Sequence, residues 1–158
     1  MNRDDPSFHP LSLSRRVEPL LVLSLLLTLA TACTSLLGIF NTSLVYPSEE
    51  LQKAFRVNDI VNLFIGVPFL LGIIWAARRQ KLNGVLYWPG VLLYVLYNHI
   101  AYLIAMPQVW ATIAHALIAG LTAYTVSGLF KSIDGQQVQD ITGKAMPAKF
   151  AGGVLAGL

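Results

Sequence analysis

Residues 20–40, with the sequence LLVLSLLLTLATACTSLLGIF, decide the fold of this chain. The stretch contains 21 residues and no charged side chain. As an α-helix it would be about 31 Å long, which matches a hydrocarbon core of about 30 Å. Small hydroxyl groups recur every three or four residues along it, at Ser24, Thr28, Thr31 and Ser35. A stripe of this kind suits close packing against other helices, so we expect a membrane-spanning helix here.

The composition of the whole chain also points to a membrane protein. Of its 158 residues, 55% are hydrophobic and 12% are charged, and the mean hydropathy is +0.61. A soluble domain carries about 25% charged residues. The net charge of +3 comes from short basic groups without interleaved aromatic residues, which argues against nucleic-acid binding and favours topology signals. Cys33 is the single cysteine, so an intrachain disulfide is excluded.

Three further apolar segments follow, and together they predict an all-α bundle of four complete transmembrane spans. They cover residues 57–77, 85–106 and 109–130. Ser48 precedes two acidic residues and should cap the helix that leads into the second span. Pro68 removes a backbone donor in the middle of that span, so we expect a kink there.

Three local patterns predict how these helices pack. On the helix of the second span, one face should hold Asp59 and Asn62, because their spacing follows the helical repeat. Trp88, at the start of the third span, is typical of an anchor at the membrane interface. Ala116 and Gly120, four residues apart in the fourth span, favour a close helix contact.

The distribution of basic residues predicts an N-terminus on the cytoplasmic side of the inner (plasma) membrane. With that orientation, nine basic residues lie inside and two lie outside, a strong positive-inside bias. The inner set is Arg3, Arg15, Arg16, Arg78, Arg79, Lys81, Lys131, Lys144 and Lys149, and the outer set is Lys53 and Arg56.

The two ends of the chain are expected to lie outside the bundle. Residues 1–19 form a cytoplasmic lead, and residues 131–150 form a second cytoplasmic segment. Residues 151–158 resemble the opening of another apolar span, but eight residues are too few to cross a bilayer. We therefore expect a truncated chain, with either further helices or an oligomeric partner completing it.

A second interpretation of the first span remains open. Arg15 and Arg16, the apolar run after them and the Ala30-Thr31-Ala32 triplet imitate a signal peptide with its cleavage site. The apolar run continues through Phe40, beyond the supposed cleavage site, which favours a retained helix.

A pattern of residues between about 44 and 130 resembles a family of uncharacterised bacterial multispan integral membrane proteins. It consists of Tyr46-Pro47 with Glu50, Asn58-Asp59, Gly66-x-Pro68, Ala77-Arg78-Arg79, Gly84-x-Leu86-x-Trp88-x-Gly90, Tyr97-Asn98 and Tyr102. The resemblance implies a longer chain with more helices, and it implies no activity. This chain has His99 where the family has tyrosine, so a role of His99 would not be shared by the family.

Polar side chains in the middle of the third span provide the main functional clue. The run YVLYNHIAY, residues 94–102, places an amide and an imidazole where lipid is expected, and such groups are costly there unless they face protein or water. His99 and His115 are each eight residues from Pro107, so they should lie at matched depth, about 12 Å below the outer turn. The candidate ligand-binding layer is Asp59, Asn62, Asn98, His99, Tyr102 and His115.

Three roles are compatible with this layer. The six side chains could hydrogen-bond between helices and hold the bundle together. They could line an externally open site for a small molecule, a lipid headgroup or a proton. They could also form a membrane-embedded enzyme or metal site with His99, His115 and Asp59, although no catalytic motif, phosphate loop or cofactor signature is present in the sequence.

Overall fold

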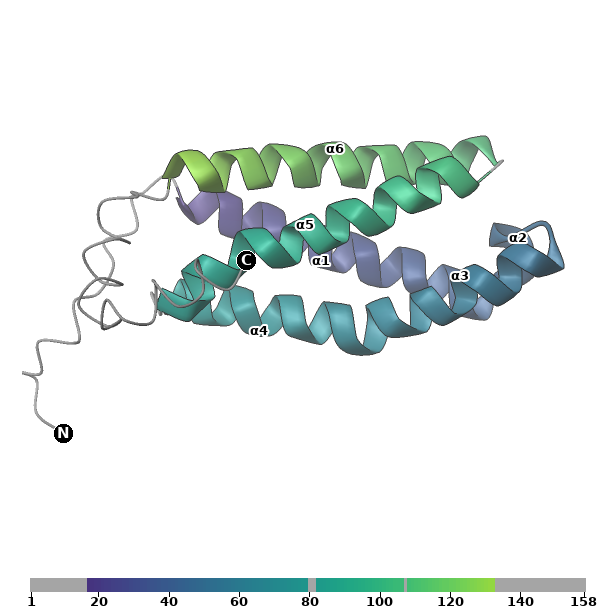
Figure 1. Ribbon diagram of the computed structural model, residues 1–158, viewed down its shortest axis with the longest axis horizontal. Coiled ribbons are helices and arrows are strands. Elements are labelled where there is room, and N and C mark those ends of the chain that lie inside the picture. The colour runs from purple at the N-terminus through teal and green to yellow at the C-terminus, as the bar shows by residue number, and fades with distance from the viewer. Residues whose placement is uncertain (1–16, 80–81, 107, 133–158) are drawn as a thin grey trace, which may run out of the picture.

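The computed structural model describes residues 17–79, 82–106 and 108–132 and confirms the all-α prediction (Figure 1). Within these residues, four stretches are long and apolar enough to cross a membrane, which makes this a multispan membrane protein. The elements are α1 (Val17–Phe40), α2 (Thr42–Val45), α3 (Glu49–Val61), η1 (Asn62–Gly66), α4 (Val67–Arg78), α5 (Leu82–Ala105) and α6 (Val109–Ser132). The predictions for residues 1–16 and 133–158 lie outside the described residues.

The second span is built from α3, η1 and α4, which form one continuous helix with an irregular middle. Ser48 caps its start as predicted, because its hydroxyl accepts a hydrogen bond from the Leu51 amide at 3.3 Å. The irregularity is a π-helical turn immediately before Pro68, in which the Val67 amide bonds to a carbonyl five residues back. Pro68 has no amide proton for the carbonyl of Phe64, so both features loosen the helix at the same place.

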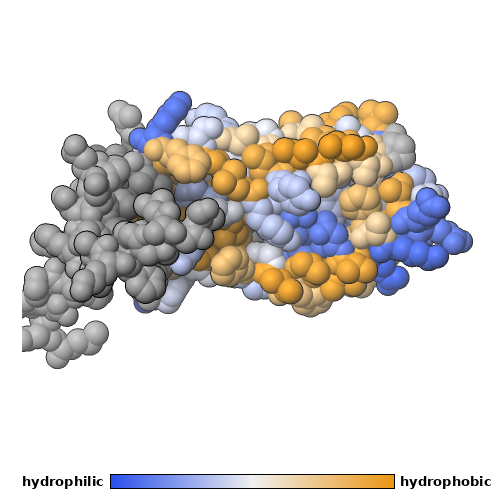
Figure 2. All heavy atoms as spheres, viewed as in Figure 1, coloured by the Kyte–Doolittle hydropathy of each residue, from blue (hydrophilic) through white to orange (hydrophobic). Residues whose placement is uncertain are grey.

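The four spans pack as a bundle in which α5 contacts α4 and α6, while α1 contacts α3, α4 and α6. Figure 2 shows hydrophobic side chains along the flank, as expected of a surface that faces lipid, and hydrophilic ones at the end formed by α2 and α3. A hydrophilic patch also interrupts the flank between α5 and the second span (Figure 2). Polar groups inside this bundle therefore reach close to one side of it.

Two sets of residues pack differently from what their patterns suggest. Trp88 does not face the surroundings of the bundle, because its side chain is fully buried and its indole N–H donates to the Ser24 hydroxyl at 2.9 Å. Its position at the membrane interface stays a prediction. Ala116 and Gly120 do not mediate a contact between helices of this chain, because both are exposed and the space around Gly120 is open. The buried face of α6 instead carries His115, Thr122 and Thr125 together with the small residues Ala111 and Ala119.

Candidate functional site

A buried carboxylate, Asp59, lies toward the end of the bundle formed by α2 and α3 and has hydroxyl partners. The Tyr102 hydroxyl donates to its Oδ1 at 2.7 Å, and the Tyr46 hydroxyl donates to its Oδ2. The carboxylate packs against the backbone of α1 at Gly38, where a side chain would collide with it. Asp59 thus joins α3 to α1, α5 and the loop between the first two spans.

Tyr46 closes this site from the loop side. It follows α2, its side chain is 1% exposed, and its ring stacks on Phe55 with the centroids 5.8 Å apart. Phe55 in turn lies 4.9 Å from the ring of Tyr102, so three aromatic rings cover the carboxylate. The loop is therefore part of the site, although it lies outside the spans.

An amide bridge extends the site along α5. The Asn58 amide nitrogen donates to the Asn98 side-chain oxygen at 3.0 Å and to the Tyr102 hydroxyl at 3.1 Å. Asn98 donates to the Tyr94 carbonyl on its own helix at 3.0 Å. These bonds fix the position of Tyr102, which is the residue that contacts the carboxylate.

The two histidines form a direct pair, as the matched depth of the helices predicts. Nδ1 of His99 and Nδ1 of His115 are 2.8 Å apart, and Nε2 of His99 is 3.2 Å from the Thr31 hydroxyl. A hydrogen bond between two Nδ1 atoms requires that one carries the proton and the other has a free lone pair. The pair can therefore hold one proton between its Nδ1 atoms but not two.

Stacking connects the histidine pair to the carboxylate. The rings of Tyr102 and His115 are nearly parallel, at 7°, with centroids 4.6 Å apart. A protonated His115 over this ring would gain a cation–π contact. Tyr102 therefore contacts both ionisable parts of the site, through its hydroxyl on one side and its ring face on the other.

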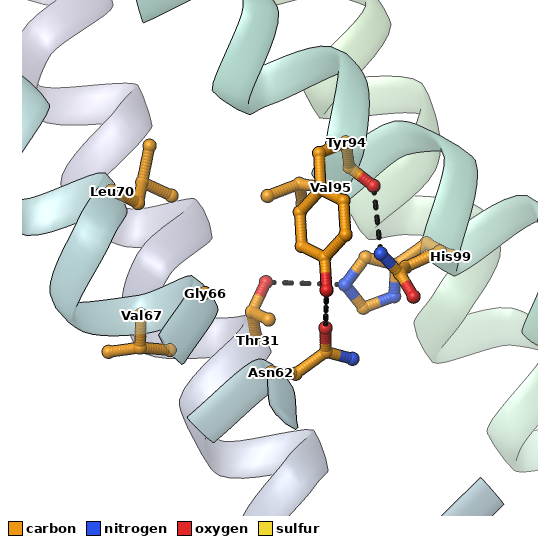
Figure 3. A pocket seen from close by; sticks show the side chains of 9 residues that line it. Thr31, Asn62, Gly66, Val67, Leu70, Tyr94, Val95 and His99 are labelled. Atoms are coloured by element: carbon orange, nitrogen blue, oxygen red, sulfur yellow. Dashed lines mark hydrogen bonds between the residues drawn. The ribbon is translucent and has the colours of Figure 1, made fainter. Parts of the chain in front are cut away.

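A small cavity lies beside His99, between α1, α5 and the π-helical turn (Figure 3). Its volume is about 10 Å³, measured as the space open to the centre of a water molecule. Asn62 lines it and accepts a hydrogen bond from the Tyr94 hydroxyl at 2.8 Å (Figure 3). Tyr94 is thus a polar partner within the site.

The structure brings all six candidate residues together in the interior. They are Asp59, Asn62, Asn98, His99, Tyr102 and His115, and each is less than one-tenth exposed. Their role as ligand-binding residues stays a prediction. Sequence reasoning missed Tyr46, Asn58, Thr31 and Tyr94 as members of the site, although Asn58 directly precedes Asp59 and Thr31 belongs to the hydroxyl stripe.

The alternative of a metal site receives no support from the geometry. Within residues 17–79, 82–106 and 108–132, no three histidine, cysteine or acidic side chains lie close enough to hold one ion. Asp59 is directed to two tyrosines, and the histidines are directed to each other. The observed arrangement is a hydrogen-bonded cluster rather than a ligand set.

Comparison with known proteins finds no family model, curated protein or solved structure that matches this chain. The resemblance to bacterial multispan proteins, and the bacterial origin that it implies, therefore stay predictions.

Removing the Tyr46 hydroxyl is expected to change the dependence of stability on alkaline pH. Burial, with the neighbouring Tyr102 and Asp59, raises the pKa of the Tyr46 hydroxyl above its usual value of 10.0. Above that pH the unfolded chain loses a proton that the folded chain keeps, so stability falls by up to about 1.4 kcal/mol per pH unit. The variant Tyr46→Phe lacks this contribution and should lose stability less steeply than the wild type.

The measurement is the free energy of unfolding in detergent from about pH 9 to about pH 11. Tyr87→Phe is the matched control, because Tyr87 is 60% exposed. The expectation would be contradicted if the free energy of unfolding fell equally steeply with pH in Tyr46→Phe and in the wild type above about pH 10.

Proposed function

We propose that this chain is a non-enzymatic, transport-associated or accessory membrane protein whose outer polar cluster binds and releases a proton. In this proposal, the N-terminus is cytoplasmic, the cluster lies in the outer half of the inner membrane, and the first span is retained. The observation that carries the proposal is Asp59, a buried carboxylate whose partners are hydroxyl groups.

The surroundings of Asp59 support proton binding. In the described part of the chain, the salt bridge found is the surface pair Lys53 and Glu49, so no lysine or arginine neutralises Asp59. An unpaired charge is expensive in an apolar interior, and binding a proton removes that charge. Because a tyrosine hydroxyl can donate or accept, Tyr46 and Tyr102 can serve the charged and the neutral carboxyl alike.

The size of the cavity supports a proton over a larger ligand. The space beside His99 admits about one water molecule, whereas small-molecule sites have volumes of about 300–1,000 Å³. A lipid headgroup or a metabolite would first require the helices to separate. A bound proton needs no such space.

Infrared spectroscopy of the protein in lipid nanodiscs tests this proposal. We expect the difference spectrum between acidic and alkaline buffer to contain a carboxylic-acid C=O band that disappears in Asp59→Asn. Glu50→Gln is the control, because Glu50 is an exposed acid in the first turn of α3. The proposal fails if Asp59→Asn, like Glu50→Gln, retains every carboxylic-acid C=O band of the wild type.

A second outcome separates proton binding from a purely structural role. If the cluster only holds helices together, Asp59→Asn should melt at a lower temperature without any change in the titration spectrum. If the cluster binds a proton, the variant should lose the carboxyl band even at a temperature where its helical content equals that of the wild type.

A further inference from the structure

We propose that a polar patch on the flank of the bundle binds a second copy of this chain, so that two copies pair about a two-fold axis along the membrane normal. The patch lies between α5 and the second span, where Figure 2 shows hydrophilic side chains that interrupt the apolar flank. Its two hydrogen-bonding groups that matter for pairing are the hydroxyl of Tyr97 and the side-chain oxygen of Asn58. Pairing of this kind does not depend on proton binding at Asp59.

Tyr97 exposes a hydroxyl group deep inside a membrane span. Its side chain is 71% exposed, and no hydrogen bond of its hydroxyl is found among the described residues. About 12 Å of helix separate Tyr97 from the end of α5 at Ala105, and about 22 Å separate it from the start at Leu82. A tyrosine side chain is too short to bring its hydroxyl to either membrane surface from there. An unpaired hydroxyl in hydrocarbon is costly, so a hydrogen-bond acceptor should lie against it.

Asn58 supplies a complementary acceptor on the second span. Both hydrogen bonds found for its side chain are donated by the amide nitrogen, to Asn98 and to Tyr102. Because Tyr102 gives its own proton to Asp59, it can only accept from Asn58, which fixes the orientation of the amide. Asn58 is part-buried, and its oxygen is not among the described buried atoms that lack a partner. That oxygen therefore reaches the surface, where it can accept a hydrogen bond from outside.

The donor and the acceptor lie at the same level of the membrane. Asn58 bonds to the side chain of Asn98, and Asn98 directly follows Tyr97 on α5, so the two groups differ little in depth. A two-fold axis along the membrane normal keeps every residue at its own depth, and it makes each contact of an interface occur twice. Such an axis can bring Tyr97 of each copy to Asn58 of the other.

The composition of the patch favours a second copy over lipid. Val61 and Ile65 follow Asn58 at spacings of three and four residues on the second span, and both are exposed. Lipid chains would cover these apolar side chains but would leave the hydroxyl of Tyr97 and the oxygen of Asn58 unpaired. A second copy covers the apolar side chains and also pairs both polar groups, because it carries the matching donor and acceptor at the required depth.

The test measures association between copies in lipid vesicles, from energy transfer between chains labelled at the N-terminus, over a range of protein-to-lipid ratios. We expect the wild type to associate, and Tyr97→Phe to associate about tenfold more weakly because the symmetric pair loses two hydrogen bonds at once. A tenfold change corresponds to about 1.4 kcal/mol for the two bonds together. Tyr124→Phe is the matched control, because Tyr124 is 66% exposed on α6, outside the polar patch, and it should associate like the wild type.

Mixed pairs test the two-fold symmetry directly. One wild-type copy and one Tyr97→Phe copy keep one of the two bonds, so they should associate about threefold more weakly than two wild-type copies. The proposal is overturned if the wild type does not associate, which would show that the patch faces lipid, or if Tyr97→Phe associates as tightly as Tyr124→Phe. It is also overturned if mixed pairs associate as weakly as two variant copies, because the contact would then not consist of two equivalent bonds.

Discussion

Replacing Gly38 with alanine is expected to lower the free energy of unfolding by about 3–5 kcal/mol. The added Cβ would lie 1.8 Å from Oδ2 of Asp59 and 2.7 Å from the Tyr46 hydroxyl. Either the carboxylate must leave its two tyrosine partners, or α1 must move away from α3. Both changes disrupt a buried polar network, which costs far more than the gain in helix propensity from glycine to alanine.

The measurement is reversible unfolding in mixed detergent micelles, followed by circular dichroism. Gly120→Ala makes the same chemical change in α6 at a position with open space, so its stability should equal or slightly exceed that of the wild type. A Gly38→Ala protein within about 0.5 kcal/mol of Gly120→Ala would show that Asp59 is not held against α1.

Gly84→Ala should have an effect of similar size, for a reason that does not involve the polar cluster. Its Cβ would lie 2.3 Å from the Ala77 amide nitrogen and 2.5 Å from the Ala76 carbonyl carbon. These are backbone atoms, so the clash is relieved only by moving α4 away from α5. We expect a loss of about 3 kcal/mol, at the upper end of the cost of overpacking.

The same unfolding experiment tests this second expectation, with Gly90→Ala as the control on the same helix. Gly90 has open space around it, so alanine there should be tolerated. Gly84→Ala should also leave the Asp59 carboxyl band in place, because the contact that it disrupts lies in α4, away from the carboxylate. Equal stability of Gly84→Ala and Gly90→Ala would contradict the close approach of the two helices.

The sequence predicts the helices and the depth of their polar groups well, because both follow from the fixed rise of an α-helix. His99 and His115 meet because each is eight residues from the same proline, and Ser48 caps α3 because a serine before two acids is a strong local signal. Such relations between residues follow from the number of residues that separate them along a helix.

Other parts of the site depend on contacts that counting does not reveal. Tyr46 lies in a loop, so no helical repeat relates it to Asp59, and the loop must fold back before the two side chains meet. Trp88 occupies a position typical of an interface anchor, but its partner Ser24 is 64 residues away and turns it inward. The π-helical turn ends two residues before Pro68, and a proline alone indicates only that a regular helix is interrupted, not which kind of turn replaces it.

The local hydrogen bonds of the buried hydroxyl groups have a consequence for membrane insertion. Ser24, Thr28, Thr122 and Thr125 each donate to a carbonyl four residues back on their own helix, so α1 and α6 can enter the bilayer with these groups already satisfied. Among the described residues, the side-chain hydrogen bonds found for Asp59 and His99 run to other segments of the chain. During biogenesis, the second and third spans should therefore remain beside the translocon until their neighbours arrive, and the polar cluster would set the order in which the spans are released into lipid.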